Sequence, residues 1–439
     1  MPVTAASVAT ELVARGLDQR DHGAKQSLYT GVIERHSMLR GRPPEHVWWV
    51  PGRLEVFGKH TDYAGGRTLV SPVSRGFAVA ASARDDNVVR VVDAWRAESV
   101  LVPVHRPAAP HAGWRRYVEV AVHRLASNFP GAAFGADIVI ASDLPRASGM
   151  SSSSALVVAI AATLGKIGAL PTHPAWKLNV RSGLDAAGYY ACIENGRSFA
   201  ALQGDGGVGT HGGSEDHAAI VEGRPRMVSA YAFVPARPLG AERIPGDWRF
   251  VIAPSGVAAR KTGEAREPYN RLSAGISRLL EAWNADGPRA ISLAAALKAA
   301  PDAAMRLRGL AERAAKPEMS AQWLRDRLEH FLREDERPLQ AMAAFAAKDE
   351  RSIGELSAAS QSDAERLLGN QVPATSALAG SARTLGAFAA SSFGAGFGGA
   401  VWALVASDDA DHFADKWHRD AFVMHAGVPL TDLSAQEGF

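Results

Sequence analysis

The sequence predicts a mixed α/β protein of two domains. A chain of 439 residues is longer than one ordinary hydrophobic core supports. Strand-like and helix-like segments alternate before a polar Gly and Pro cluster at residues 222–226. After that cluster come a strand-like stretch at Phe250, long alanine-rich helical stretches, and a strand-like VWALV followed by another helix. We therefore expect an N-terminal domain over residues 1–225 and a C-terminal domain over residues 226–439.

The composition argues against several kinds of partner. Hydrophobic residues make up 47% and charged residues 21% of a chain with a net charge of +2, which is typical of a soluble globular protein. No basic run with interleaved aromatic residues occurs, so we expect no nucleic-acid partner. The charge-free stretch from Thr384 to Ser407 contains too many glycines and serines for a membrane span, so we expect no membrane partner.

The N-terminal segment and the cysteine count bear on location. Val8, Leu12, Val13 and Leu17 have the spacing of an amphipathic helix, and the segment lacks the apolar core of a secretory signal. Cys192 is the only cysteine, which excludes an intramolecular disulfide. We therefore expect a cytoplasmic protein.

Residues 51–66, PGRLEVFGKHTDYAGG, combine groups that suit a binding site. They follow a strand-like VWWV, and we expect Pro51 and Gly52 to end regular strand pairing and to place Arg53 at the edge of an element. Arg53 offers a planar fork of donors for phosphate or carboxylate, and His60 and Asp62 can bond to a polyol from one side. The structural alternative is a polar hairpin with one surface ion pair.

Residues 144–156, LPRASGMSSSSAL, predict a phosphate-binding turn. They follow a strand-like stretch at residues 136–142, and a broadly apolar helical segment begins at Ala155. The four serines at residues 151–154 therefore lie in the first helical turn or in the loop before it. Unpaired amides at a helix start, aligned peptide dipoles and small hydroxyl groups favour a polyphosphate, and Gly149 removes the side chain that would block it. A serine-rich cap without a ligand is the alternative, although one cap needs only one serine.

Residues 391–406, SSFGAGFGGAVWALVA, form a third segment of interest, with four glycines at positions 394, 396, 398 and 399. A glycine-rich backbone can pass beneath a nucleotide or a sugar without a clash. A glycine-rich turn that leads into a buried strand would have the same sequence, so this segment alone does not decide between the two.

In their order and spacing, the three segments resemble the galactokinase branch of the GHMP family, the small-molecule kinases named for galactokinase, homoserine kinase, mevalonate kinase and phosphomevalonate kinase. The first resembles the galactokinase signature, the second the phosphate loop and the third the C-terminal glycine-rich motif. WRRYVEVAVHRL from Trp114 and SGVAARKTGEAREPYNR at residues 255–271 resemble further parts of galactokinases. The resemblance covers residues 47–407. It implies an N-terminal domain and a ferredoxin-like C-terminal domain with the active site in the cleft between them.

The resemblance also implies an activity and a set of ligands. The activity is the ATP-dependent phosphorylation of a monosaccharide at its anomeric C1 hydroxyl. The ligands are ATP, Mg²⁺ and a small-molecule sugar, and the oligomeric state is left open. It assigns nucleotide contacts to Gly149, Ser151, Ser152, Ser153, Ser154 and Trp114, and sugar contacts to Lys59, His60, Asp62 and Tyr269. Trp114 at helical spacing from Tyr117 is also typical of packing, and Tyr269 could be a core aromatic residue.

The resemblance places the catalytic carboxylate at Asp216, beside Arg53. Galactokinases usually have Gly, Ile, Met, Asp, Gln there, whereas this chain has Gly, Ser, Glu, Asp, His at residues 213–217. Glu215 and Asp205 therefore remain competing candidates. An Asp216 in a solvated turn is the structural alternative, because acidic residues are mostly exposed.

Two metal sites are considered. The resemblance implies Mg²⁺ held by a phosphate-loop serine and a helix glutamate, which match Ser153 and Glu194; an exposed charge is the alternative for Glu194. A zinc site would use His211, Glu215, Asp216 and His217, but no second histidine lies at the helical i, i+4 spacing.

Lys59 departs from the family pattern. Galactokinases ordinarily carry a sugar-binding glutamate before the His, Thr, Asp triplet, and an ammonium in that place reverses both charge and hydrogen-bond polarity. One hypothesis is that Lys59 binds the carboxylate of a uronic acid such as galacturonate; the alternative is a lysine that faces solvent. A catalytically silent sensor of sugar and ATP is a second class of function, although Arg53, Ser153, Ser154 and Asp216 are all present and favour catalysis. A mevalonate or homoserine kinase would lack the sugar signature.

Overall fold

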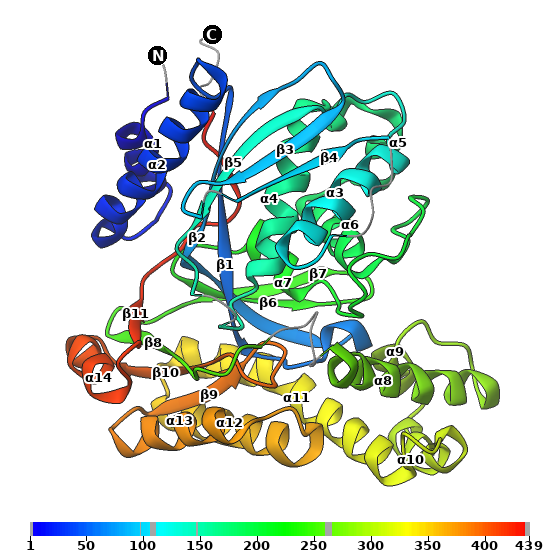
Figure 1. Cartoon of the computed structure of the whole chain (residues 1–439). Helices are drawn as coiled ribbons and strands as arrows, with labels where there is room; N and C mark the ends of the chain where they lie inside the picture. The colour runs from blue at the N-terminus through cyan, green and yellow to red at the C-terminus, as the bar shows by residue number, and fades with distance from the viewer. Residues whose placement is uncertain (1–2, 97, 106–110, 146–147, 260–265, 435–439) are drawn as a thin grey trace.

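The computed structural model describes residues 3–96, 98–105, 111–145, 148–259 and 266–434. Parts of two segments discussed above, residues 146–147 and 260–265, lie outside these ranges. The described chain forms two β-sheets that are stacked along the molecule and covered by helices (Figure 1). No helix within the described ranges is long and apolar enough to cross a membrane.

The first sheet has eight strands in the described chain. Six follow the order β12-β1-β2-β5-β3-β4, while β6 pairs with β2 and β7 pairs with β6. Neighbours are antiparallel except for β3 and β5, which are parallel. The strands are β1 (His46–Phe57), β2 (Arg67–Ala83), β3 (Val88–Asp93), β4 (Ser99–Pro103), β5 (Ala136–Ser142), β6 (Met227–Ala232), β7 (Arg237–Arg243) and β12 (Thr431–Asp432). The strand predicted at residues 136–142 is confirmed.

Helices lie on both sides of this sheet (Figure 1). One side carries α1 (Ala5–Ala14) and α2 (His22–Arg40), and the other carries α3 (Trp114–Asn128), α4 (Ser152–Ile167), α6 (Gly183–Asn195) and α7 (Glu215–Glu222), with the short α5 (Pro174–Asn179) before α6. The amphipathic helix predicted at the N-terminus is α1, which buries Val8 and Leu12. Leu17 is buried too but lies beyond the end of that helix.

The second sheet is antiparallel, and its alternating side chains belong to two different cores. Its order is β11 (Phe422–Met424), β8 (Trp248–Pro254), β10 (Ala400–Ala406) and β9 (Ala389–Phe393). Phe250, Ile252 and Trp402 join the main core with residues of α11 (Ala321–Ala347) and α12 (Glu350–Asp363). Val251 and Val401 instead pack with α13 (Pro373–Thr384) and α14 (Ala410–Trp417). This alternation is the two-residue period of a strand. The strands predicted at Phe250 and at VWALV are confirmed.

The alanine-rich stretches form a helical subdomain, which we define as α8 (Arg266–Asp286), α9 (Leu293–Lys298), α10 (Ala303–Ala314) and the first half of α11. It has a core of its own that includes Leu279, Trp283 and Phe331. Ala64 of the short η2 helix (Asp62–Ala64) belongs to the same core. The helical subdomain therefore packs directly on the segment that follows β1.

The chain leaves the first sheet later than the domain boundary predicted at 225/226. Residues 227–243 form β6 and β7 and stay in the first sheet, because their backbone groups pair with β2 and with each other. Residues 431–432 return to pair with β1. The chain therefore passes to the second sheet between Arg243 and Trp248 and comes back to the first at β12.

β1 continues through the residues that were expected to end it. Pro51 pairs with Gly76, and the register shifts between Pro51 and Arg53 and again between Glu55 and Phe57. Such irregularities bend a strand and redirect its side chains. The Arg53 amide donates to the Met150 carbonyl oxygen at 3.3 Å, so the first irregularity joins β1 to the serine-rich segment.

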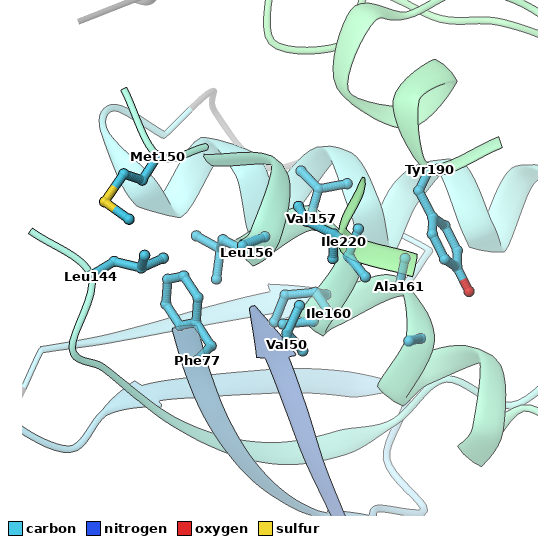
Figure 2. Close-up of a cluster of buried hydrophobic side chains, with 14 of the residues drawn as sticks. Val50, Phe77, Leu144, Met150, Leu156, Val157, Ile160, Ala161, Tyr190 and Ile220 are labelled. Atoms are coloured by element: carbon cyan, nitrogen blue, oxygen red, sulfur yellow. The ribbon is translucent and has the colours of Figure 1, made fainter. Parts of the chain in front are cut away.

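Apolar contacts hold the start of α4 against the sheet. Figure 2 shows Leu156 and Ile160 of α4 close to Phe77 and Val50 of the strands, with Met150 and Leu144 to the left of them. The helix begins at Ser152, so the serines lie in its first turn and just before it, as predicted. This packing places the serine-rich turn beside Arg53.

Candidate active site

Arg53 and Asp216 form a buried ion pair. The Arg53 Nε donates to Asp216 Oδ1 at 2.7 Å, and a terminal nitrogen of Arg53 lies 2.6 Å from the same oxygen. The other terminal nitrogen donates to the Gly149 carbonyl oxygen at 2.6 Å. Burial alone would lower the pKa of Arg53, but three neighbouring carboxyl groups outweigh it and raise that pKa. The expected proximity of Arg53, the serine-rich turn and Asp216 is therefore present.

Asp216 lies in the first turn of α7 and faces the first turn of α4. Its Oδ2 is 3.1 Å from the Ser154 hydroxyl, which also lies 2.8 Å from Glu194 Oε2. Ser154 therefore joins the last turn of α6 to the predicted catalytic carboxylate. The solvated-turn alternative does not hold, because the Asp216 side chain is only 13% exposed and is fixed by Arg53.

The serine next to Glu194 differs from the predicted one. Ser154 contacts Glu194, whereas Ser153 faces the neighbouring cavity described below. A carboxylate and a hydroxyl oxygen suit Mg²⁺, which keeps several waters and takes further oxygens from nucleotide phosphates. Glu194 with Ser154 therefore fits that ion better than Glu194 with Ser153. No cluster of three or more His, Cys, Asp or Glu residues suited to a metal occurs in the described chain.

The sugar signature folds into a tight polar loop. Asp62 Oδ2 accepts the Glu215 amide at 3.1 Å, which ties the loop to the start of α7. Gly213 permits this approach, because a Cβ there would meet Asp62 Oδ2 at 2.2 Å. His60 has a positive φ of 57°, and its Nε2 lies 3.1 Å from the Ala395 carbonyl oxygen in the glycine-rich segment.

Tyr269 of the helical subdomain completes this side of the site. Its ring lies 5.5 Å from that of His60, and the hydroxyl would be 2.8 Å from a Cβ at Gly212. Arg327 of α11 donates to the His60 carbonyl oxygen at 2.7 Å and to the Tyr63 hydroxyl at 2.8 Å. The helical subdomain therefore holds the loop in place and contributes a wall of the pocket.

These residues enclose a narrow polar pocket, which we call the acceptor pocket. Its volume is about 40 Å³, and its polar lining includes Arg53, Glu55, His60, Asp62, Tyr63, Ser154, Glu194, Asn195, Thr210, Glu215, Asp216, His217 and Tyr269. Glu55, Tyr63, Asn195 and Thr210 were not predicted as site residues, and His217 was considered only as a zinc ligand. Glu55 could have been found, because it stands two residues after Arg53 on a strand and so shares its face. The others come from loops and helix ends whose approach depends on the fold.

Lys59 does not line the acceptor pocket. Its side chain is 1% exposed, and its ammonium donates to the Ser360 hydroxyl at 2.6 Å and to the Ser391 hydroxyl at 2.8 Å. Burial lowers the pKa of Lys59, and Glu334 opposes that shift. The hypothesis that Lys59 binds a uronic acid thus loses its geometric basis, and the solvent-facing alternative is wrong as well. Lys59 is an internal link between the sugar signature, α12 and β9.

The three candidates for the catalytic carboxylate differ in their position relative to the acceptor pocket and to Arg53. Asp205 lies outside the acceptor pocket, with a side chain that is 38% exposed and 3.5 Å from Arg124. Glu215 lines the pocket, 3.4 Å from Arg53 Nε, and is farther from that guanidinium than Asp216 is. Burial raises the pKa of Glu215 well above the usual range, with Glu55 as the next contribution. Asp216 therefore has the strongest contact with Arg53.

A larger cavity of about 330 Å³ lies beside the serine-rich turn, and we call it the nucleotide cavity. Gly149, Ser151, Ser152, Ser153 and Trp114 line it as predicted, together with Phe77, Asp93, Trp95, Arg96, Tyr117 and Leu156. Ser151 has a positive φ of 58°, and its buried hydroxyl has no hydrogen-bond partner among the described residues. The first amides of a helix also lack partners within the helix. This lining suits an anion with an attached planar base.

The glycine-rich segment separates the two cavities. Ala395 lines both of them, and Gly394 lines the acceptor pocket. A Cβ at Gly394 would lie 2.9 Å from the Gly149 carbonyl oxygen, so only a glycine allows this contact without a shift. The prediction that this loop runs close beneath ligand sites therefore agrees with the geometry.

The Arg53–Asp216 pair has the serine-rich start of α4, which suits a polyphosphate, on one side and the polar acceptor pocket on the other. This arrangement is typical of a small-molecule phosphotransferase. Family models support this class. The galactokinase galactose-binding signature matches residues 34–83, the GHMP kinases N terminal domain matches residues 116–192, and the GHMP kinases C terminal model matches residues 341–423. The chain belongs to the galactokinase branch of the GHMP kinases.

Relatives and solved structures agree with this assignment. A galactokinase of Roseiflexus sp. (strain RS-1) is 29% identical over 394 residues, covering 88% of this chain and 90% of that protein. A galactokinase of Chloroflexus aurantiacus is 29% identical over 406 residues, covering 91% and 93%. The crystal structure of Lactococcus lactis galactokinase complexed with galactose superposes with a TM-score of 0.75 at 22% identity, covering 92% of this chain and all of that one. The last match shows a shared fold.

Proposed function

We propose that this sugar kinase transfers the γ-phosphoryl group of ATP to the anomeric hydroxyl of galactose. The observation that carries the proposal is the Arg53–Asp216 pair, which stands where the acceptor pocket meets the phosphate-binding turn. A sugar hydroxyl next to Asp216 would lie in front of a polyphosphate held at the start of α4. The galactose-binding signature and the galactokinase relatives favour galactose among neutral sugars.

The proposed step needs little covalent chemistry from the protein. The anomeric oxygen attacks the γ-phosphorus in line, its proton passes to Asp216, and the bond from phosphorus to the bridging oxygen of ADP breaks. Arg53 offsets the charge of Asp216 and fixes its orientation through two contacts to Oδ1. His60, Asp62 and Tyr269 would orient the sugar, and correct positioning is a large part of such catalysis.

Mg²⁺ is the expected companion of ATP. When bound, it would offset charge on the phosphate oxygens, and Glu194 and Ser154 are the residues that would hold it. The cytoplasmic location stays a prediction.

A sugar panel tests the proposal. The protein is incubated with ATP, Mg²⁺ and galactose, galacturonate, arabinose or glucuronate, and ADP release and sugar 1-phosphate are measured. We expect turnover of galactose. Absence of turnover with every sugar, combined with measurable binding of sugar and ATP, would instead support a silent sensor.

A matched pair of variants tests the catalytic carboxylate. Asp216→Asn keeps the size of the side chain but removes the proton acceptor, so we expect kcat to fall roughly 10²–10⁴-fold. Asp205→Asn makes the same change outside the acceptor pocket, and kcat should stay close to that of the wild type. If Glu215→Gln abolished turnover while Asp216→Asn retained it, the assignment would pass to Glu215.

A further inference from the structure

The acceptor pocket holds more carboxyl groups than its arginine can neutralise. Arg53 lies 2.6 Å from Asp216, 3.4 Å from Glu215 and 3.9 Å from Glu55. Asp62 and Glu194 line the same pocket. One guanidinium balances one carboxylate, and Asp62 and Glu194 accept hydrogen bonds from the Glu215 amide and the Ser154 hydroxyl. Glu55 and Glu215 are the two acidic groups of this set with a buried oxygen that has no hydrogen-bond partner among the described residues.

Glu215 Oε1 lies 3.4 Å from Arg53 Nε, whereas Glu55 has an oxygen that does not face the guanidinium. Glu55 is 3% exposed and lines the pocket from the same strand as Arg53. Its Oε2 faces Arg53, whereas its buried Oε1 has no hydrogen-bond partner among the described residues. An unpaired buried oxygen is unfavourable, so such a group in a pocket wall points to a ligand that pairs with it.

The charged groups that face Glu55 come from several elements. They are Arg53 on the same strand, Lys59 in the following loop, Glu215 and Asp216 of α7, and Glu334 of α11. Burial raises the pKa of Glu55 to about 7, against the opposing charges of Arg53 and Lys59. Glu55 therefore carries a proton for part of the time near neutral pH and can then donate a hydrogen bond as well as accept one.

We propose that Glu55 is a specificity-determining residue that binds a hydroxyl group of the acceptor sugar through Oε1 and excludes sugars that carry a carboxylate. A neutral hexose hydroxyl pairs with either form of a carboxyl group. A uronate would place a further negative charge beside Asp216 and the ionised form of Glu55, and like charges in contact are strongly unfavourable. The inference rests on the proposed function, and it predicts that the enzyme discriminates against uronic acids.

Two variants at position 55 distinguish a role in binding galactose from a role in excluding galacturonate. Glu55→Ala removes the sugar contact, so we expect the KM for galactose to rise roughly tenfold with a smaller change in kcat. Glu55→Gln keeps the size of the side chain and its ability to bond a hydroxyl, but cannot become charged. Its KM for galactose should stay within about threefold of the wild type, while the inhibition constant of galacturonate falls roughly tenfold. Glu281→Gln makes the same exchange at a side chain that is 62% exposed and serves as the control.

The wild type supplies a measurement that needs no variant. As pH rises from 6 to 8, Glu55 gains charge, so the inhibition constant of galacturonate should increase relative to the KM for galactose. In Glu55→Gln that ratio should be flatter with pH. Thermal unfolding of each variant separates a loss of folding from a change of specificity.

The outcomes distinguish the two proposals. If the wild type phosphorylates no neutral sugar, the proposed function fails. If it phosphorylates galactose, yet Glu55→Gln and Glu55→Ala leave both the KM for galactose and the inhibition by galacturonate within twofold, Glu55 has no role in specificity and only this inference is overturned. Faster turnover of galacturonate than of galactose by the wild type would also overturn it.

Discussion

The acceptor pocket and the nucleotide cavity share Ala395 as a wall but use different chemistry. In the acceptor pocket, the protein itself brings the charge, in five carboxyl groups and one arginine. In the nucleotide cavity, serine hydroxyls, glycine backbone and aromatic rings dominate, and the charged lining residues are Asp93 and Arg96. The first is narrow at about 40 Å³ and the second is open at about 330 Å³.

The contrast teaches which kinds of change each region should tolerate. Buried charges are held by specific partners, so loss of one partner leaves another uncompensated. A helix start with small side chains depends on backbone geometry, so moderate side-chain changes there should affect ligand binding more than folding. Changes around the acceptor pocket should therefore have larger effects than changes in the lining of the nucleotide cavity.

The largest expected effect is on stability, from Lys59→Met. The substitution removes a buried cation that faces Glu334. Arg337, 2.5 Å from Glu334 Oε2, is then the cation that still pairs with this carboxylate. We expect the free energy of unfolding to fall by about 3 kcal/mol. Denaturant unfolding at pH 7 measures it, with the 61% exposed Lys348→Met as the control. Unchanged discrimination between galactose and galacturonate would confirm that Lys59 does not contact the sugar.

The next effect is on catalysis, from Gly213→Ala. The new methyl group would meet Asp62 Oδ2 at 2.2 Å and must displace the loop that carries Asp62 or the start of α7. We expect kcat/KM for galactose to fall roughly 10²-fold, with the affinity for ADP unchanged. Gly206→Ala lies earlier in the same loop with nothing within 4 Å of the new atom and should behave as the wild type. Equal losses in both variants would contradict a local clash.

A third prediction concerns pH and stability. The pKa of Glu55 is raised by burial from 4.5 to about 7, so its contribution to stability is present below pH 4.5 and is lost as pH rises through 7. Glu55→Gln has no such loss. Between pH 5 and pH 8, the variant should gain stability relative to the wild type, by roughly 2 kcal/mol. Unfolding curves at the two pH values measure this, and a pH-independent difference would show that Glu55 ionises normally.

The smallest effect is expected in the nucleotide cavity, from Ser151→Ala. Its hydroxyl is buried without a hydrogen-bond partner among the described residues, so its removal should leave the unfolding temperature unchanged or slightly higher. The KM for ATP should rise about fivefold, because a phosphate oxygen would lose one donor. A marked loss of stability with no change in KM would mean that the hydroxyl supports the fold and not the ligand.

Local sequence patterns predicted the elements that carry the site. Alternation located β5, and the apolar run after the serines located α4. The segments at residues 51–66 and 144–156 identified Arg53, Asp62 and the serine-rich turn, and the family resemblance identified Asp216, before their proximity was known. These predictions succeeded because strand and helix periods and helix-start chemistry are properties of a few neighbouring residues. The extent of β1 was missed, because partners from distant strands hold Pro51 and Gly52 in the sheet.

By itself, the sequence determined the family, the mixed α/β class and most of the groups that meet in the cleft, since these follow from short-range patterns and from motif order. The tertiary structure alone decided where individual side chains point. Lys59 turns inward to Ser360 and Ser391, Ser154 rather than Ser153 contacts Glu194, and Glu55 lines the acceptor pocket. These outcomes depend on which distant element supplies a partner for a buried charge, and local sequence does not contain that information.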